Sequence, residues 1–365
     1  MIDNVSIKNF LSIRELNAFK LKTVNILIGG NGVGKTNFIS FLKLLKNIST
    51  KALQKHLADL SGANNVIFKG SKNNDSLSGR IEFTNSNAYE FTLNKNNSNK
   101  LYFSHELAAY HYGRWINYVS QDVGSVESEL DSIIFKYKKE KGYEGVPGYV
   151  NNALKGFEIY HFHDTSRNSP IKQPSNVSDN RFLRFDGSNI ASFLYMLENI
   201  YPFIYKQIIG TIRNIAPFFD RFDISPLFLE EDLVQLDWKE IGSDKYFGPH
   251  QLSDGSIRMI ALITLLLQPN PPKTIIIDEP ELGLHPAAIS LLAELIKQAS
   301  ERSQIIISTQ SVTLINHFQP DDIIIVERQD AQTVLRRLEA KECEQWVAEY
   351  SLGDVWEKNV FGGRP

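Results

Sequence analysis

The feature that most constrains the fold is a glycine-rich octapeptide near the amino terminus. Residues 29–36 read Gly29-Gly30-Asn31-Gly32-Val33-Gly34-Lys35-Thr36 and match the pattern G-x-x-x-x-G-K-S/T. The apolar run Val24–Ile28 predicts a buried strand before this loop, and the apolar spacing of Asn37–Lys46 predicts a helix after it. A strand, a glycine-rich loop and a helix in this order indicate a phosphate-binding loop in an α/β fold.

The loop residues predict how a nucleotide would be bound. Backbone N–H groups between Gly29 and Asn37 would surround its phosphates, and the positive end of the helix dipole would stabilise their charge. Lys35 would reach the β- and γ-phosphates, and the Thr36 hydroxyl would bind Mg²⁺. We therefore expect a nucleoside triphosphate and Mg²⁺ as ligands.

An apolar strand that ends in two carboxylates complements the loop. Thr274–Asp278 is followed by Glu279 and a proline. Asp278 would hold the Mg²⁺ through its hydration shell, and Glu279 would orient or deprotonate the attacking water. Asp278 lies 242 positions after Thr36, whereas simple nucleotide-binding domains keep these motifs much closer. A large segment is therefore inserted within one nucleotide-binding core.

A third motif lies shortly before the acidic strand. Leu252 is followed by Ser253, Asp254, Gly255 and Ser256, and then by a predicted helix. Serine and glycine at the amino terminus of a helix form a backbone concavity that binds anions. We therefore assign Ser253–Ser256 to phosphate recognition.

The periodicity of apolar residues predicts three parts. Residues 1–103 would form an amino-terminal lobe with the phosphate loop and a β-subdomain, which includes a hairpin over 80–103. Residues 104–250 would form an inserted helical lid with strands returning to the core. Within it, 104–150 is expected to be mixed and mainly helical, 163–187 a long loop and 190–215 helical. Residues 251–365 would form the carboxy-terminal lobe with alternating helices and strands.

Composition excludes several classes of protein. The one cysteine, Cys343, rules out an internal disulfide framework and a cysteine-cluster metal site. The longest apolar stretch, near Ile260–Leu267, is far shorter than the ~20 residues that cross a bilayer. No secretory signal is visible at the start, so we expect a cytoplasmic location. The net charge of -3 means that any basic surface is local.

Taken in order, the motifs resemble a known class. The phosphate loop, Leu252–Ser256, Asp278–Glu279 and Glu281–Pro286 resemble the ABC-type ATPases of the SMC, RecF and OLD class. The sequence is more similar to a bacterial family of RecF/OLD-like AAA ATPases found in anti-phage defence loci. That closer resemblance also includes the segments Tyr160–Ser166, Leu183–Asn189, Ser308–Ser311, Tyr350–Trp356 and Gly362–Pro365.

The resemblance implies an ABC/SMC-type P-loop ATPase head with two lobes, an inserted helical lid and no long coiled coil. It implies a homodimer that closes around two ATP molecules, with Ser253 and Gly255 contacting the γ-phosphate bound to the partner subunit's phosphate loop. The segment Glu281–His285 would be the D-loop that couples the two sites. It further implies control of a separately encoded Toprim-like nuclease or toxin, contact with nucleic acid and no membrane role.

One position departs from the class. The strand after the acidic strand usually ends in a histidine that touches the γ-phosphate, but here it ends in Ser308-Thr309-Gln310. A glutamine can hydrogen-bond a phosphate but cannot carry a proton, so Gln310 favours slow, switch-like hydrolysis. The Q-loop glutamine of the class has one candidate here, Gln54.

Other features have a functional and a structural interpretation. His161 and His163 alternate next to Asp164, which could suggest a metal site. No third ligand has suitable spacing, which favours a structural or nucleotide-adjacent role for the histidines. Lys136–Lys141 could bind a phosphate backbone, although a solvated helix face is the favoured interpretation. Trp346 and Trp356 would pack in the tail or dock a partner.

Intrinsic nuclease activity is not expected. Glu327 ends a strand, as the catalytic glutamate of a Toprim nuclease does, but too few residues follow it to supply the later acidic strand. The main hypothesis is an ATP-driven switch that senses or clamps nucleic acid and controls an effector. A stand-alone RecF-like repair ATPase is the alternative, and a transporter ATPase subunit is disfavoured by the RecF-like start and the absence of membrane segments.

Overall fold

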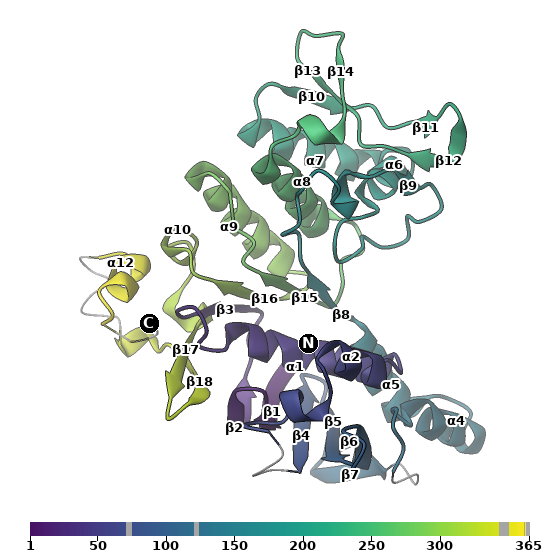
Figure 1. Cartoon of the computed structure of the whole chain (residues 1–365), viewed down its shortest axis with the longest axis vertical. Coiled ribbons are helices and arrows are strands. Elements are labelled where there is room, and N and C mark those ends of the chain that lie inside the picture. Colours follow the sequence, from purple (N-terminus) through teal and green to yellow (C-terminus); the bar gives the residue numbers. More distant parts are fainter. Residues whose placement is uncertain (71–74, 120–123, 343–349, 361, 363–365) are drawn as a thin grey trace. The chain divides into compact units, whose positions relative to one another are not determined.

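The chain leaves one structural unit and later returns to it. A computed structural model describes residues 1–70, 75–119, 124–342, 350–360 and 362. The first unit contains Met1–Glu158 and Gln319–Pro365, and the second contains Ile159–Phe318. The second unit is therefore an insertion in the sequence of the first (Figure 1).

A six-stranded antiparallel sheet dominates the first unit. Its strand order is β2-β1-β4-β5-β6-β7. The strands are β1 (Ile2–Phe10), β2 (Ile13–Lys20), β4 (Ser76–Phe83), β5 (Asn87–Lys95), β6 (Leu101–Tyr112) and β7 (Arg114–Val119). Every second residue of β4 is buried, which is the period expected of a strand with one face on the core.

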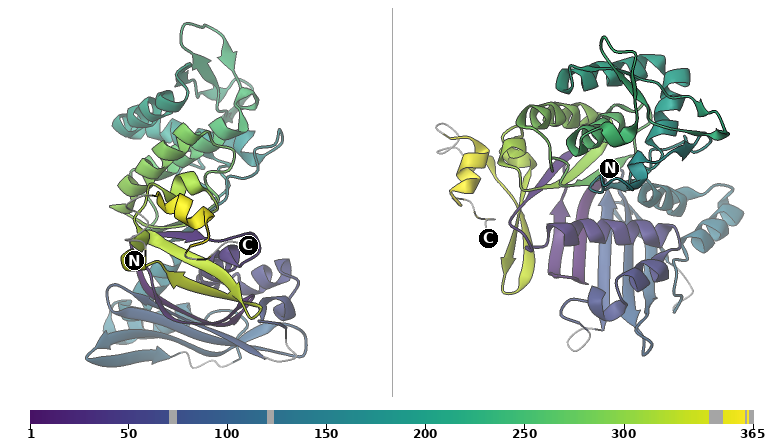
Figure 2. Two further views of the ribbon diagram at one scale, coloured as in Figure 1. Left: turned by 90° about the vertical axis from the view of Figure 1, so that its left-hand side faces the viewer. Right: turned by 45° about the horizontal axis from the view of Figure 1, so that its top comes forward.

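The helix α1 (Lys35–Ser49) lies across this sheet (Figure 2). Phe41 of α1 packs edge-on against Phe10 and stacks with Phe91, with ring centroids 5.6 and 6.3 Å apart. Gly79 on β4 leaves room for this contact, because a Cβ there would lie 2.6 Å from the Phe41 ring. The other helices of this part are α2 (Leu53–Asp59), α3 (Ala63–Val66), α4 (Leu130–Lys141) and α5 (Gly145–Lys155).

Three further strands of the first unit support the phosphate loop. They are β3 (Val24–Ile28), β17 (Ile323–Gln329) and β18 (Gln332–Arg337). β17 runs parallel to β3, and β18 returns antiparallel to β17 as a hairpin. All five residues of β3 are buried, as expected of a strand covered on both faces. The 3₁₀ turn η3 (Pro320–Asp322) precedes β17, and α12 (Leu352–Glu357) lies near the carboxy terminus.

Two parallel strands and two long helices form the part of the second unit that carries the acidic strand. β15 (Thr274–Asp278) and β16 (Gln304–Thr309) pair in parallel, and α9 (Pro286–Ser300) connects them. α8 (Asp254–Leu267) packs against α9 and is buried from Ile257 to its end. β8 (Phe157–Tyr160) carries the chain into this unit, and α10 (Val312–Ile315) lies near its end.

The rest of the second unit consists of two helices and several short strands. A proline separates its two helices, α6 (Ile190–Ile200) and α7 (Pro202–Ile215), because Pro202 has no N–H and disfavours a helical Tyr201. Two three-stranded sheets complete it, with orders β10-β13-β14 and β11-β12-β9. The strands and 3₁₀ turns are β9 (Ser175–Asn176), β10 (Phe219–Phe222), β11 (Pro226–Leu227), β12 (Glu230–Val234), β13 (Trp238–Glu240), β14 (Tyr246–Phe247), η1 (Pro170–Lys172) and η2 (Pro249–Gln251).

The structure corrects two expectations from the sequence. Residues 104–119 are not helical but continue β6 and form β7, which complete the antiparallel sheet. The expected boundaries at 103/104 and 250/251 therefore differ from the structural division, because 104–158 packs with the first unit and 159–318 forms the second. The 80–103 hairpin and the 190–215 helices are confirmed. Cys343 and Trp346 lie outside the described residues.

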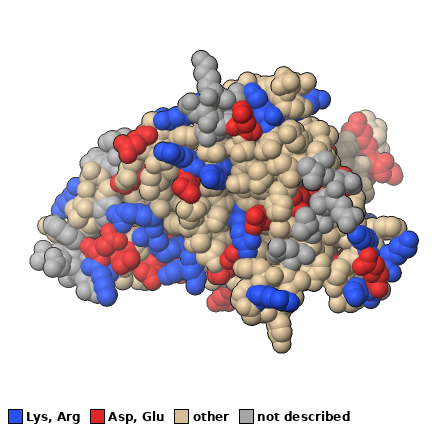
Figure 3. Space-filling model, turned by 90° about the horizontal axis from the view of Figure 1, so that it is seen from below, with Lys and Arg blue, Asp and Glu red and all other residues tan. Residues whose placement is uncertain are grey.

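The distribution of charge and the character of the helices bear on what the chain contacts. On the face shown in Figure 3, Lys and Arg side chains are interspersed with Asp and Glu rather than gathered into one broad basic area. Among the described residues, none of the helices has both the length and the apolar character that a membrane crossing needs.

Candidate functional site

The phosphate loop is arranged around a buried ammonium group. Lys35 is only 6% exposed, and its Nζ donates to the carbonyl oxygens of Gly29 at 2.7 Å and Gly30 at 3.0 Å. Gly34 is the N-cap of α1 and contributes no side-chain cap. A cation beside the amino terminus of a helix, whose dipole favours negative charge there, suits a polyphosphate. These residues therefore fit a nucleotide.

Three of the four loop glycines have different structural reasons for lacking a side chain. A Cβ on Gly29 would lie 2.4 Å from the Val326 carbonyl oxygen, and one on Gly34 would lie 2.0 Å from Thr333 Oγ1. These two glycines allow the loop to pack closely on β17 and β18. Gly32 differs, because its φ of +75° needs glycine while a Cβ there would meet no atom within 4 Å. The backbone at Gly32 is therefore the part of the loop with open space beside it.

Two hydroxyl groups far apart in the sequence hold the loop in place. Thr333 Oγ1 donates to the Val33 carbonyl oxygen at 2.6 Å and lies 2.6 Å from Ser12 Oγ. Asn37 Nδ2 donates to the same Ser12 Oγ at 2.5 Å, so the Asn37 side chain helps to hold the loop. The contact of the Asn37 backbone N–H with nucleotide stays a prediction. Asn31 and Thr36 are exposed. Sequence reasoning missed Ser12 and Thr333, which have no motif of their own.

The acidic strand presents its second carboxylate from a strained backbone. Glu279 follows β15 with a φ of +43°, which is unfavourable for any residue other than glycine. Its N–H donates to the Ser308 carbonyl oxygen at 2.8 Å, which holds this conformation. Asp278, at the end of β15, is half-buried like Glu279. Strain of this kind is common where a side chain must be aimed at a ligand.

Gln310 contacts the predicted catalytic carboxylate directly. Its Nε2 donates to Glu279 Oε1 at 2.8 Å. Contact of Gln310 with phosphate stays a prediction from the sequence. In the structure one of its partners is Glu279, and a neutral amide in this place can orient the carboxylate without exchanging a proton with it.

A buried carboxylate lies behind this pair. Glu281 Oε1 accepts hydrogen bonds from Thr309 Oγ1 at 2.5 Å and from the Gln310 N–H at 3.3 Å. Its Oε2 is buried and has no hydrogen-bond partner among the described residues. Burial raises the pKa of Glu281 above its ordinary value, and the hydrogen bond from Thr309 opposes this only in part. Ionised Glu281 therefore lowers the stability of the folded state.

The raised pKa of Glu281 predicts how the stability difference between Glu281→Gln and wild type changes with pH. A carboxyl group whose pKa is raised by folding contributes stability at low pH that is lost as the pH rises through the folded-state pKa. Glu281→Gln cannot ionise, so its Tm relative to wild type should be higher at pH 8 than at pH 5. Thermal unfolding at both values, with the exposed Glu301→Gln as control, measures this difference. An equal difference in Tm between variant and wild type at pH 5 and pH 8 would contradict a raised pKa of Glu281.

The signature motif caps a helix and contacts the D-loop of its own subunit. Ser253 is the N-cap of α8, and its Oγ accepts a hydrogen bond from the Ser256 N–H at 3.1 Å. Ser253 and Asp254 are exposed. A Cβ on Gly255 would lie 2.6 Å from the Gly283 carbonyl oxygen, so glycine at this position is needed for packing within the subunit.

Lys172 holds Asp254 from below the surface. It is 5% exposed, and its Nζ donates to the Thr165 carbonyl oxygen at 2.6 Å and to Asp254 Oδ1 at 3.2 Å. The hydrogen bond from Lys172 holds the pKa of Asp254 below its ordinary value. The signature residue Asp254 therefore has a fixed cationic partner in its own subunit.

One of the two neighbouring histidines contacts the acidic strand. His163 Nε2 lies 2.8 Å from the Asp278 carbonyl oxygen, and the His161 and His163 rings are 6.1 Å apart. Among the described residues, no group of three histidine, cysteine or acidic side chains could hold a metal ion. This contact favours the structural interpretation of His163.

Comparison with known proteins then identifies the chain. The model of a family described as "AAA domain, putative AbiEii toxin, Type IV TA system" matches residues 24–316. The chain belongs to the AAA_21 family. The match spans the phosphate loop, the signature, the acidic strand and Gln310. No curated protein matches the chain in sequence.

The AAA_21 chain has the fold of SMC head domains. It is similar to an SMC head bound to the C-winged helix domain of ScpA, with a TM-score of 0.60 and 17% identity over 94% of this chain and 99% of that one. An SMC head with an extended coiled coil, bound to the C-terminal domain of ScpA from Pyrococcus furiosus, has a TM-score of 0.55 and 17% identity over 95% of this chain and 98% of that one. An SMC head with a coiled coil and joint from Pyrococcus yayanosii has a TM-score of 0.54 and 13% identity over 95% of this chain and 99% of that one.

These matches confirm the expected ABC/SMC-type head. The expected absence of a long coiled coil agrees with the described helices, of which the longest, α1 and α9, have 15 residues each.

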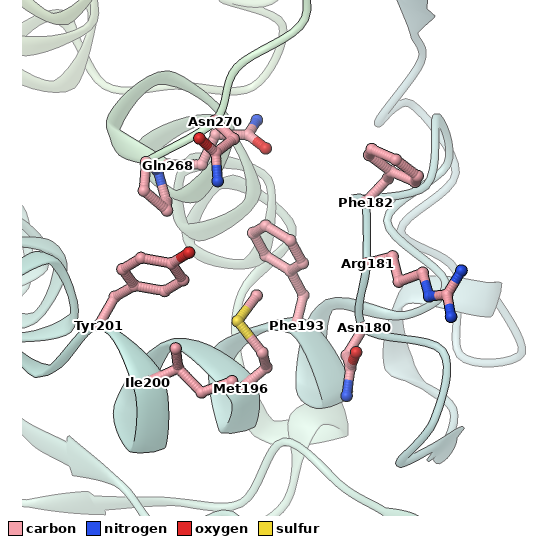
Figure 4. Close-up of a pocket in the computed structure, with 10 residues that line it drawn as sticks. Asn180, Arg181, Phe182, Phe193, Met196, Ile200, Tyr201, Gln268 and Asn270 are labelled. Carbon is pink, nitrogen blue, oxygen red and sulfur yellow. The ribbon is translucent and has the colours of Figure 1, made fainter.

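A separate pocket in the second unit of the AAA_21 chain is lined mainly by apolar and amide side chains. Its volume is about 380 Å³, and Phe193 and Met196 lie side by side between Tyr201 and Phe182 (Figure 4). The remaining lining residues are Asn180, Arg181, Ile200, Gln268, Pro269 and Asn270. The lining contains neither a carboxylate nor a histidine, so this pocket is not a candidate active site.

Three secondary expectations also have a place in the structure. Gln54 Nε2 donates to the carbonyl oxygens of Leu101 and Val126, which leaves its amide engaged in the β-subdomain. Glu327 accepts from Gln329 Nε2 at 3.0 Å, and Gly362 packs closely against it. On α4, which carries the lysine run 136–141, only Leu130 is buried, as expected of a solvated helix.

Proposed function

We propose that this AAA_21 protein binds and hydrolyses ATP as a slow molecular switch. The observation that carries the proposal is the phosphate loop, in which a buried Lys35 lies at the amino terminus of α1 and would meet a polyphosphate together with the helix dipole. Thr36 and Asp278 would hold Mg²⁺, which neutralises charge on the phosphate oxygens. The family membership supports the same conclusion, because its model covers all of these residues.

The chemistry would depend on Glu279 and its neighbour. Glu279 would orient the attacking water or take its proton, and the Gln310 amide would fix the carboxylate through its 2.8 Å hydrogen bond. Because the amide does not accept a proton, Gln310 adds no second general base. This supports slow turnover, as a switch that dwells in its ATP-bound state requires.

We further propose that ATP closes a homodimer. The exposed Ser253 and the backbone of Gly255, at the amino terminus of α8, would contact the γ-phosphate bound by a second copy. Hydrolysis would remove this contact and reopen the dimer. The switch would thus convert ATP into a change of assembly state.

Ser253→Arg tests the shared site. The variant should bind ATP within about twofold of wild type, because Ser253 belongs to the signature and not to the loop that holds Lys35. Its hydrolysis should fall by roughly 10- to 100-fold, since a bulky cation blocks the neighbour's phosphate. Phosphate release and equilibrium ATP binding measure the two effects.

A control and a mixture sharpen the result. Ser351→Arg also removes an N-cap serine, from α12, and should leave hydrolysis unchanged. Mixing Ser253→Arg with Lys35→Ala subunits should restore one working composite site in each heterodimer. Wild-type hydrolysis by Ser253→Arg alone would rule out the shared-site arrangement.

The output is proposed to be control of a partner in the cytoplasm. The family description names a toxin of a type IV toxin–antitoxin system, which supports a role in prokaryotic defence against phage. Between β11 and β12 the chain presents Phe228 and Leu229, which are 94% and 88% exposed. Exposed apolar tips of this kind commonly mark protein contacts. A Toprim-like nuclease or toxin, with nucleic acid as trigger, is the proposed partner.

The partner proposal has a direct assay. The lone protein should leave DNA and RNA uncut with Mg²⁺ or Mn²⁺, because Asp278 and Glu279 serve the nucleotide. Co-purification with the product of a neighbouring gene, with and without ATP, should give an ATP-dependent complex. Cleavage by the lone wild type that disappears in Glu327→Ala would place the nuclease in this chain.

A further inference from the structure

One charged side chain lies where the apolar pattern of α8 predicts a core residue. Arg258 is flanked by Ile257 and Met259, is 5% exposed and follows the signature by two positions. Its guanidinium donates only to backbone carbonyl oxygens in the hydrogen bonds that we observe. Nε donates to Phe162 at 2.9 Å, Nη2 donates to His163 at 3.2 Å, and Nη1 donates to Leu282.

This arrangement requires the shape of an arginine. A buried cation costs free energy unless its donors are satisfied, and here three carbonyl oxygens from two segments satisfy a planar fork. A lysine ammonium is a point charge on a flexible stem and does not reproduce this geometry. The position of Arg258 is therefore explained by the segments that it joins.

The two segments lead to different parts of the candidate site. Phe162 and His163 follow β8, and the His163 ring contacts the Asp278 carbonyl oxygen at 2.8 Å. Leu282 lies in the D-loop between Glu281, which contacts Thr309, and Gly283, which packs against Gly255. Signature, D-loop and acidic strand thus meet through a continuous set of contacts around one guanidinium.

We propose that Arg258 is a positioning residue that holds the signature turn and the D-loop of one subunit in a fixed relation to Asp278 and Glu279. This inference rests on the proposed ATPase function and adds the way in which its parts are coupled. Arg258 itself touches neither nucleotide nor metal. It makes the signature and the acidic strand respond together when a nucleotide binds to either.

Arg258→Lys is the test, because it keeps the charge and removes the fork. ATP hydrolysis should lose roughly 10- to 100-fold in kcat, the range expected when catalytic groups are misplaced by about 1 Å. The Kd for ATP, measured by equilibrium binding, should stay within about twofold of wild type. The readout is therefore a loss of kcat with ATP affinity preserved.

The chain offers a control arginine that also donates to backbone carbonyl oxygens, at the other end of α8 and away from the signature. Arg302 donates to the carbonyl oxygens of Leu266 and Gln268 at the far end of α8, at 3.1 and 3.0 Å. Arg302→Lys should therefore keep the wild-type kcat. A kcat for Arg258→Lys within twofold of wild type, or an equal loss in both variants, would overturn the positioning role.

Two measurements separate this inference from protein stability and from the proposed function. Activity is expressed per folded molecule from thermal unfolding, and a loss explained by unfolding alone would overturn the inference. If Arg258→Lys does not fold, Gly283→Ala replaces it, because its Cβ would lie 3.0 Å from Arg258 Nη1. The same kcat-selective loss is expected, and an unchanged kcat would overturn the inference. Absence of hydrolysis in wild type would instead refute the proposed function.

Discussion

Glu279→Gln is expected to abolish ATP turnover while leaving ATP binding intact. The substituted amide keeps an oxygen for the hydrogen bond from Gln310 Nε2 but cannot take a proton from water. A positioned general base contributes roughly 10²- to 10⁴-fold, so kcat should fall by that factor. The ATP-bound dimer should then accumulate, which light scattering detects as a doubled mass.

A matched acid-to-amide change lies two residues away. Glu281→Gln alters a buried carboxylate that contacts Thr309 and the Gln310 backbone, and so does not remove the proton acceptor at position 279. It should retain much more activity than Glu279→Gln. Wild-type turnover by Glu279→Gln would mean that another group orients the water.

Lys35→Ala is expected to abolish tight ATP binding. The ammonium is the charge partner of the β- and γ-phosphates in the proposed complex, and removing one member of a buried charged pair costs about 2–5 kcal/mol. The Kd for ATP should therefore rise roughly 30-fold or more. Calorimetric titration with ATP and Mg²⁺ measures this change.

The same substitution should also affect the free protein. Lys35 is buried against the Gly29 and Gly30 carbonyl oxygens. Its loss leaves two carbonyl groups without this donor, at about 1–3 kcal/mol of stability. The control is Lys22→Ala, at a partly exposed lysine that pairs with Asp321 on the surface, and it should change neither property by more than a small amount. Unchanged affinity in Lys35→Ala would show that the loop is not used.

The sequence predicted the parts of the site whose chemistry is local. A phosphate loop, an acidic strand end and a signature turn each have a short pattern because neighbouring residues create the function. Ser12 and Thr333 are 321 positions apart, so their contact becomes visible only in the structure. Arg258 did carry a signal, since a charged residue within an apolar helix needs buried partners.

The fold was predicted best where apolar periodicity was clean. The carboxy-terminal strands and helices alternate plainly, and the structure confirms them. We expected residues 104–150 to be mixed and mainly helical, but 104–119 lie in β6 and β7. Leu107, Ala108 and Ala109 are consecutive apolar residues and lack the alternation that predicts a strand. All three are buried in β6, where packing on both faces removes the period of two. The hairpin strand β18 was not predicted, because its last two residues, Arg336 and Arg337, are charged and interrupt the apolar pattern of a strand.

Phosphate release as a function of protein concentration tests the central claim most directly. If ATP is hydrolysed in composite sites between two copies, the rate per molecule should rise with concentration and level off once the ATP-bound dimer is saturated. The account predicts slow release with this curvature. No release, or a rate per molecule that is constant from the lowest measurable concentration to well above the dimer range, would contradict it.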